Sequence, residues 1–247
     1  MRRLYSPSKN IFRHKIIIDE NNDQFHHAKN VLRLKVDDEV IIFDDKKNEY
    51  QAILEKILPK SIIFNIKYKE NFIPNLSRVK ITVACAIPKA SHMDDIIDKL
   101  TQLGVDRIIP LETERVIVKL DKHKKILRQQ RWNKIALNAS QQSQRNTLPI
   151  LEPVKKIKEF LSDSGSFDLK LIPALIGHRK PLKEALKNSK PKNILVMIGP
   201  EGDFTPGELE LAEKAGCIPV TLGDLVLRVE TAAVAVAGFI RLYYDES

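Results

Sequence analysis

Two short polar segments in the C-terminal third of the chain carry the residues best suited to chemistry. Residues 198–208 read Ile-Gly-Pro-Glu-Gly-Asp-Phe-Thr-Pro-Gly-Glu, and residues 222–232 read Leu-Gly-Asp-Leu-Val-Leu-Arg-Val-Glu-Thr-Ala. Each follows an apolar run, 193–198 or 217–222, that predicts a buried strand, and each precedes a predicted helix. Loops that leave neighbouring parallel strands meet at one edge of the sheet, where α/β proteins bind ligands. We therefore expect one shared pocket and an enzyme.

The first segment predicts a helix that begins beside a tight backbone turn. Thr205 is expected to be the N-cap, Pro206 the first helical residue and Glu208 the reciprocal partner of a capping box. Before this cap, Gly199 and Gly202 lack Cβ atoms, so the backbone could approach a ligand closely. A purely structural strand-to-helix turn is the alternative interpretation.

The second segment places Arg228, Glu230 and Thr231 just before residues 232–240, a stretch that is apolar on nearly every side. Such a helix must be buried, against the sheet or against a second subunit. Charges at its start are costly unless they are paired or bind something. A ligand site is one interpretation, and a structural ion pair between Arg228 and Glu230 is the other.

Several common chemistries lack their motifs. The sequence has no Gly-x-Gly-x-x-Gly after a strand and no Walker lysine, which argues against a Rossmann-type nucleotide site and a P-loop. The six histidines are scattered without metal-ligand spacing, so we expect no metal site. Cys85 and Cys217 lie inside apolar runs and are expected to be core residues.

The charge of the chain is strongly basic, with a formal net value of +9. The densest run, Lys119 to Lys134, holds seven basic side chains and only Asp121 opposing them. This charge favours a polyanionic partner, although a solvated helix face would look similar. No secretory signal and no apolar stretch long enough to span a bilayer is visible, so we expect a cytoplasmic protein with no membrane partner.

Secondary-structure patterns divide the chain in two. Up to about residue 70, four short predicted strands and one helix, 23–34, favour a small β-barrel. Those strands are 15–18, 39–43, 49–54 and 61–68. After a linker at 71–77, strands and helices alternate, which predicts a parallel sheet covered on both faces. Its predicted elements are strands 79–87, 105–110, 169–172, 193–198 and 217–222, and helices 93–103 and 122–143, one after 179, one from 206 and one at the end.

These residues resemble the bacterial 16S ribosomal RNA uridine-N3 methyltransferases of the SPOUT superfamily, nearly end to end. The two polar segments carry the resemblance, together with shorter motifs in the same order. Those motifs are Arg3-Leu-Tyr5, residues 27–33 (His-Ala-Lys-Asn-Val-Leu-Arg), residues 99–105 (Lys-Leu-Thr-Gln-Leu-Gly-Val), Glu114-Arg115, Trp132, Lys134, Gln142-Ser143, Arg145 and Pro149.

The resemblance implies a PUA-like RNA-binding barrel over residues 1–74 and a SPOUT α/β methyltransferase domain over residues 75–247. The second domain would contain a deep trefoil knot that holds S-adenosylmethionine. The implied lining of that site is Ile198, Gly199, Pro200, Glu201 and Gly202 on one wall and Leu222, Gly223, Leu227, Arg228 and Thr231 on the other. The family usually acts as a homodimer, and the resemblance suggests the assembled small ribosomal subunit as substrate.

For the mechanism, we expect a flipped-out uridine and an in-line methyl transfer. Arg228 would stabilise the negative charge left when N3 loses its proton, and Glu230 would orient Arg228. The general base stays open between Glu201 and Glu230. The residues expected to contact RNA are Arg3, His27, Arg33, Arg115 and Arg145.

Four positions depart from the family pattern, which commonly has Gly at Asp203, Glu at Gln102, and Arg at Leu225 and Asn30. Leu225 removes a cation near the expected active site. Two other functions stay open: methylation of another RNA position or a ribose 2′-hydroxyl, and a non-catalytic RNA-binding or ribosome-assembly factor.

Overall fold

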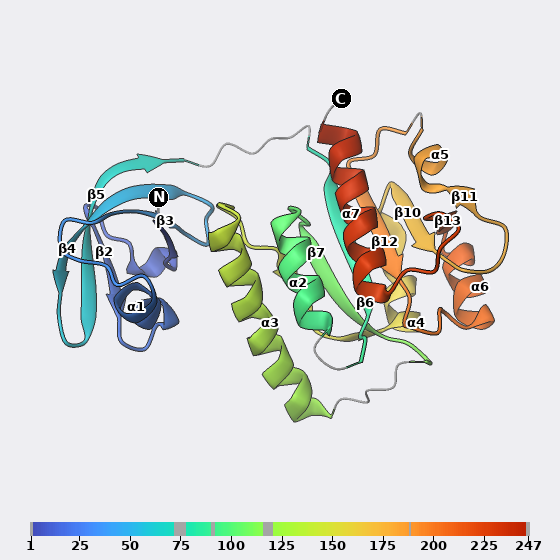
Figure 1. Ribbon diagram of the computed structural model, residues 1–247, viewed down its shortest axis with the longest axis horizontal. Helices are drawn as coiled ribbons and strands as arrows, with labels where there is room; N and C mark the ends of the chain where they lie inside the picture. Colours follow the sequence, from blue (N-terminus) through green and yellow to red (C-terminus); the bar gives the residue numbers. More distant parts are fainter. Residues whose placement is uncertain (1, 72–77, 90–91, 116–120, 188, 246–247) are drawn as a thin grey trace. The chain divides into compact units, whose positions relative to one another are not determined.

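The computed structural model describes residues 2–71, 78–89, 92–115, 121–187 and 189–245, and the chain forms two compact units (Figure 1). The first unit contains residues 1–75 and 137–148, and the second contains residues 76–136 and 149–247. Most of the linker expected at 71–77 lies outside the described residues. The division expected at residue 74 leaves out 137–148, a segment that packs with the first unit.

The first unit is a curled five-stranded sheet with the strand order β1-β3-β4-β5-β2 (Figure 1). Its strands are β1 (Arg2–Tyr5), β2 (Lys15–Asp19), β3 (Glu39–Phe43), β4 (Glu49–Ile57) and β5 (Ser61–Glu70). Strands β2 to β5 confirm the prediction, whereas β1, which pairs in parallel with β3, was not predicted. Side chains that alternate along the strands, such as Leu4, Ile16, Ile18 and Phe64, form the core.

The helix expected over residues 23–34 is shorter and changes its pitch. α1 (Asp23–His26) begins where Asn22 accepts a hydrogen bond from the backbone N–H of Gln24, and the chain continues as a π-helix, His27–Val31. Arg33 then has a φ of +50°, so the helical path ends there. A short 3-10 turn, Ser8–Asn10, precedes β2.

In the first unit, residues 137–148 are held by a buried side-chain amide. Gln141 donates from Nε2 to Oε1 of Gln24 at 2.6 Å and to the carbonyl oxygen of Arg3 at 3.2 Å. Oε1 of Gln24 also accepts from the backbone N–H of Tyr5 at 3.2 Å. These bonds tie three sequence-distant segments together, because a buried amide must find partners.

The second unit is a parallel sheet with the order β11-β13-β10-β12-β6-β7-β8, with β9 also pairing with β7. Its strands are β6 (Lys80–Ala86), β7 (Arg107–Glu112), β8 (Ile150–Leu151), β9 (Lys155–Lys156), β10 (Leu169–Pro173), β11 (Lys180–Pro181), β12 (Asn193–Ile198) and β13 (Ile218–Thr221). The described pairings within this sheet are all parallel, which confirms the expected α/β fold class.

Helices cover both faces of this sheet, and α2 lies beside α7 on one of them (Figure 1). They are α2 (His92–Gln102), α3 (Lys122–Gln142), α4 (Ile157–Ser162), α5 (Leu182–Leu186), α6 (Pro206–Lys214) and α7 (Val229–Asp245), with a 3-10 turn at Ser164–Ser166. Along β12, Ile194 and Val196 enter the core with α2 and α7, while Leu195 and Met197 enter the core with α4 and α6. Burial on both faces explains why this strand is continuously apolar.

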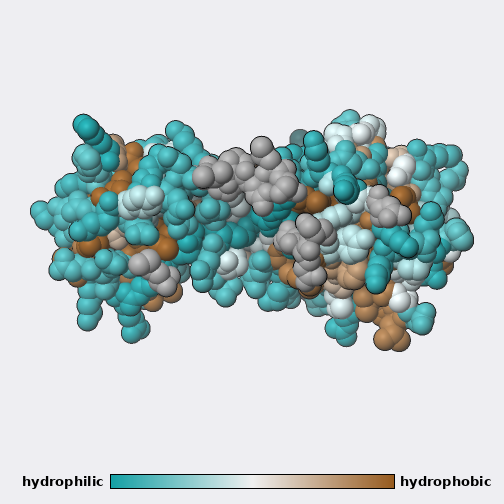
Figure 2. All heavy atoms as spheres, turned by 90° about the horizontal axis from the view of Figure 1, so that it is seen from above, coloured by the Kyte–Doolittle hydropathy of each residue, from teal (hydrophilic) through white to brown (hydrophobic). Residues whose placement is uncertain are grey.

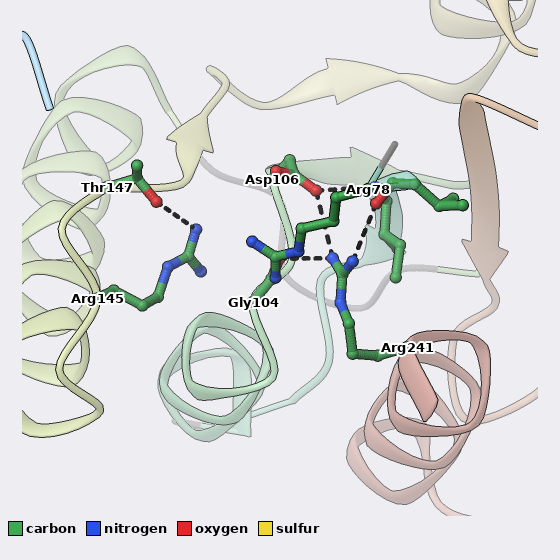
Figure 3. Close-up of polar contacts among 8 residues, drawn as sticks. Arg78, Gly104, Asp106, Arg145, Thr147 and Arg241 are labelled. Atoms are coloured by element: carbon green, nitrogen blue, oxygen red, sulfur yellow. Dashed lines mark hydrogen bonds and ion pairs between the residues drawn. The ribbon is translucent and has the colours of Figure 1, made fainter. Parts of the chain in front are cut away.

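The C-terminal half of α7 is anchored by Arg241, of which 7% is exposed (Figure 3). Its guanidinium donates to the carbonyl oxygens of Val79 at 3.0 Å and Gly104 at 2.8 Å, and lies 3.4 Å from Oδ2 of Asp106. Arg78 also donates to the Gly104 carbonyl, at 3.4 Å. These bonds fix the position of α7 on the sheet.

Candidate active site

A pocket of about 230 Å³ lies at the carboxyl ends of three adjacent strands, β13, β10 and β12. Eight of the ten residues expected to bind the cofactor line it: Ile198, Gly199, Pro200, Glu201, Leu222, Gly223, Leu227 and Arg228. Gly202 and Thr231 are exposed and lie outside this lining. The two polar segments therefore build one pocket, as their position after parallel strands predicts.

The first wall is a tight turn after β12. The backbone N–H of Asp203 donates to the carbonyl oxygen of Pro200 at 2.9 Å, and Oε1 of Glu201 accepts from the backbone N–H of Lys89 at 2.9 Å. Gly199 is closely packed, because a Cβ atom there would lie 3.1 Å from the Phe204 ring and 3.2 Å from Oδ1 of Asp203. A larger residue would therefore fit only if Phe204 or Asp203 shifted by a few tenths of an ångström.

The capping box at the start of α6 is confirmed, and it has a further role. Thr205 accepts from the backbone N–H of Glu208, and Glu208, of which 1% is exposed, accepts from the backbone N–H of Thr205 at 3.0 Å. The other carboxylate oxygen of Glu208 accepts from the backbone N–H of Glu114 at 2.8 Å. This buried carboxylate thus connects the turn after β7 to the start of α6.

Arg115, expected to contact RNA, is instead engaged with the same loop. Its Nη1 donates to the carbonyl oxygen of Gly202 and lies 3.4 Å and 3.5 Å from those of Asp203 and Phe204. This side chain holds the end of the first wall in place.

In the second wall, the described residues do not contain the ion pair considered for Arg228 and Glu230. Arg228 is exposed at the pocket, and no described carboxylate pairs with it. Glu230 is partly buried, and its Oε1 lies 3.7 Å from Nδ1 of His92 at the start of α2. Because α7 begins at Val229, successive side chains leave the helix in different directions, which separates Thr231 from the pocket.

A third wall follows β10 and was not predicted. It contributes Pro173, Ala174, Leu175 and Arg179 to the lining. Arg179 donates from Nη1 to the carbonyl oxygen of Ala174 at 3.1 Å, and Asp203 accepts from the backbone N–H of Leu175 at 2.8 Å. Strand 169–172 was predicted, but only the sheet order, which places β10 between β12 and β13, reveals that its end faces the pocket.

The two cysteines of the chain are buried, and burial raises the pKa of both thiols. Burial raises the pKa of the Cys85 thiol, and the carboxylates of Glu201 and Glu230 raise it further. Burial raises the pKa of Cys217 to about 11. Both side chains are buried, which confirms the expectation that they are core residues.

Of the cations expected to contact RNA in the first unit, Arg33 is the most exposed. Only 8% of Arg3 is exposed, its Nη2 lies 2.6 Å from Oε2 of Glu49, and its guanidinium stacks 5.5 Å from the centroid of the Phe43 ring. Arg145 is half-buried and donates to Oγ1 of Thr147 at 3.3 Å (Figure 3). His27 is partly buried, and burial and the neighbouring His26 lower its pKa, so it is neutral at physiological pH.

The basic run falls mainly on α3, with Lys119 outside the described residues. Part of its charge is balanced, since Lys125 lies 2.9 Å from Glu112 and Arg131 lies 2.7 Å from Asp94. Hydrophilic residues cover most of the face seen in Figure 2.

No cluster of three or more histidine, cysteine or acidic side chains that could hold a metal ion occurs among the residues that the structure describes. Within the same residues, none of the helices combines the length and apolar character needed to cross a membrane.

Comparison with known proteins gives the family. Residues 75–241 match the RNA methyltransferase domain family, and residues 21–67 match the RNA methyltransferase PUA domain. The chain is 31% identical to the ribosomal RNA small subunit methyltransferase E of Mesomycoplasma hyopneumoniae over 90% of this chain and 96% of that protein. It is 29% identical to that of Bacillus subtilis, over 85% and 84% of the two chains.

A solved structure agrees with these sequence relationships. The crystal structure of a ribosomal RNA small subunit methyltransferase E from Neisseria gonorrhoeae, bound to S-adenosylmethionine, is 28% identical and superposes with a TM-score of 0.84 over 98% of each chain. The chain therefore belongs to the ribosomal RNA small subunit methyltransferase E family, within the RNA methyltransferases that combine this domain with a PUA domain.

Proposed function

We propose that this protein transfers the methyl group of S-adenosylmethionine to N3 of a uridine in the 16S ribosomal RNA of the small ribosomal subunit. The observation that carries this proposal is the pocket, in which the Gly199-Pro-Glu-Gly202 turn and the segment ending in Arg228 converge after parallel strands. Membership of the family supports the methyl donor and the ribosomal RNA substrate. N3 of uridine follows from the resemblance of the two polar segments.

The lining fits the proposed cofactor. Gly223 leaves backbone uncovered by a side chain, while Ile198, Leu222 and Leu227 supply apolar surface for a base. The carboxylate of Glu201 lines the pocket and suits a cationic sulfonium. When bound, S-adenosylmethionine supplies an electrophilic methyl group.

Arg228 is the residue proposed to act on the reacting base. It lies at the pocket, exposed, and no described carboxylate pairs with it. Loss of the N3 proton leaves negative charge on the uracil ring, which a guanidinium free of carboxylate partners can stabilise. Glu230 contacts His92, so an orienting bond from Glu230 to Arg228 has no support in the described contacts. Glu201 and Glu230 remain the two candidates for accepting the proton.

For the remaining assignments, we extend the same proposal. Arg33 is the most exposed of the first-unit residues expected to contact RNA, so we assign it to phosphate contact, with His27 and Arg145 as supporting residues. We also propose a trefoil knot around the pocket, a homodimer formed by the second unit, and a cytoplasmic location beside the ribosomal substrate.

The test is methyl transfer from radiolabelled S-adenosylmethionine to small subunits that lack base methylation, followed by nucleoside analysis. We expect labelled 3-methyluridine, and we expect Arg228→Ala to reduce turnover by at least about 100-fold, the scale of losing one transition-state donor. The matched control is Lys214→Ala, which removes an exposed cation on α6. Label in a ribose or another base would overturn the uridine-N3 assignment, and donor binding without transfer would favour the non-catalytic factor.

A further inference from the structure

Asp203 occupies a backbone conformation that L-residues rarely adopt. Its φ is +61°, in the left-handed region that favours glycine, and the family pattern commonly has glycine at this position. Aspartate adopts this region more readily than most residues, because its short side chain can form local hydrogen bonds. Asp203 is partly buried and lines the pocket.

Both carboxylate oxygens of Asp203 are engaged with backbone groups. Oδ1 accepts from the backbone N–H of Phe204 at 2.8 Å, and Oδ2 accepts from the backbone N–H of Leu175 at 2.8 Å. The backbone N–H of Asp203 closes the turn to Pro200. The side chain therefore joins the first wall of the pocket to the third wall, 28 residues away in the sequence.

Apart from the bond between Arg179 and the carbonyl oxygen of Ala174, few contacts among the described residues hold the tip of the third wall. Ala174 is tied to the sheet through its backbone N–H, which donates to the carbonyl oxygen of Val220 at 3.2 Å. Beyond it, Leu175 and Ile176 are 45% and 53% exposed, so packing contributes little there. The bond from Leu175 to a charged acceptor is the strong contact at this point of the wall.

We propose that Asp203 is a positioning residue that closes the third wall onto the cofactor pocket and so sets the affinity for S-adenosylmethionine. This inference rests on the proposed function. Without the bond, the wall is in its closed position for a smaller fraction of time, and the apparent affinity falls by that fraction. Losing one hydrogen bond to a charged acceptor corresponds to a loss of about 10-fold in affinity.

The experiment measures S-adenosylmethionine binding to the full chain by calorimetry, with a melting curve of each variant in the absence of cofactor. Asp203→Gly removes the carboxylate and relieves the backbone strain, so we expect a folded protein with a Kd about 10-fold higher. The loss of affinity should appear as a matching rise in the KM for S-adenosylmethionine. Asp37→Gly, at an exposed aspartate of the first unit whose φ is +71°, is the matched control and should bind normally.

Asp203→Asn separates the hydrogen bond from the charge. Asparagine tolerates the left-handed conformation and keeps one carbonyl acceptor, so we expect it to restore part of the lost affinity. Equal losses in Asp203→Asn and Asp203→Gly would overturn the inference in favour of a direct charge effect on the sulfonium. Wild-type affinity in Asp203→Gly would overturn this inference alone, whereas a wild type that binds no S-adenosylmethionine would overturn the proposed function with it.

Discussion

Gly199→Ala tests whether the pocket depends on the close packing of its first wall. The added Cβ atom would lie 3.1 Å and 3.2 Å from two ring carbons of Phe204 and 3.2 Å from Oδ1 of Asp203. Neither neighbour can move freely, since Phe204 is 2% exposed and the Asp203 carboxylate holds two backbone N–H groups. The turn itself must therefore shift.

The magnitude follows from two opposing effects. Overpacking a well-packed site costs about 1–3 kcal/mol. Replacing glycine by alanine also restricts the unfolded chain, which returns about 0.4–1 kcal/mol. The net loss therefore lies between about 0 and 2.6 kcal/mol, or a fall of up to about 10 °C in the melting temperature of the second unit.

The measurement is thermal unfolding of Gly199→Ala beside Gly207→Ala, with S-adenosylmethionine affinity for both. Gly207 lies in the first turn of α6, and a Cβ atom there meets nothing within 4 Å. Alanine is the better helix former, so this control should be neutral or stabilising by up to about 1 kcal/mol. We expect weaker cofactor binding in Gly199→Ala only. Equal melting temperatures and equal affinities in the two variants would refute the packing argument.

Two other changes test the contacts described above. Glu208→Gln replaces one acceptor oxygen of a buried carboxylate by an N–H donor, so the backbone N–H of Glu114 or Thr205 loses its partner. We expect the free energy of unfolding, measured in urea, to fall by about 1–3 kcal/mol. Wild-type stability would contradict this. Tyr50 tests pH dependence, because burial and its hydrogen bond to Asp44 raise its pKa to about 12 in the folded state, from 10.0. The stability that the protonated Tyr50 phenol contributes is fully present below pH 10 and is lost as the pH rises towards about 12. The wild type should therefore lose stability relative to Tyr50→Phe across that interval. A free-energy difference that stays constant over it would show that the phenol does not titrate as described.

The parts of the fold predicted best are those determined by neighbours in the sequence. The start of α6 depends on Thr205, Pro206 and Glu208, which lie within one helical turn, and the capping box forms as expected. The same holds for β12, whose apolar run is buried on both faces. Local chemistry was sufficient in both cases.

Long-range pairings determined the rest. Strand β1 has only four residues, and it pairs in parallel with β3, with Arg2 opposite Val40. No local sequence pattern predicts this pairing. The third wall of the pocket could be predicted only with knowledge of the strand order of the whole sheet. Asp203 appeared in the sequence as a departure from a family pattern, and its bond to Leu175 explains how the chain uses it.

Charge shows most clearly why residue type alone does not identify a binding group. Arg3 and Arg115 are as basic as Arg228, yet Glu49 engages the first and three loop carbonyls engage the second. The buried, paired guanidinium of Arg3 has little left to offer a phosphate or a developing anion, and Arg115 uses its Nη1 to hold the loop. Arg228 differs because it lies at the pocket and no described carboxylate pairs with it. Its availability, which only the folded chain determines, makes it the catalytic candidate.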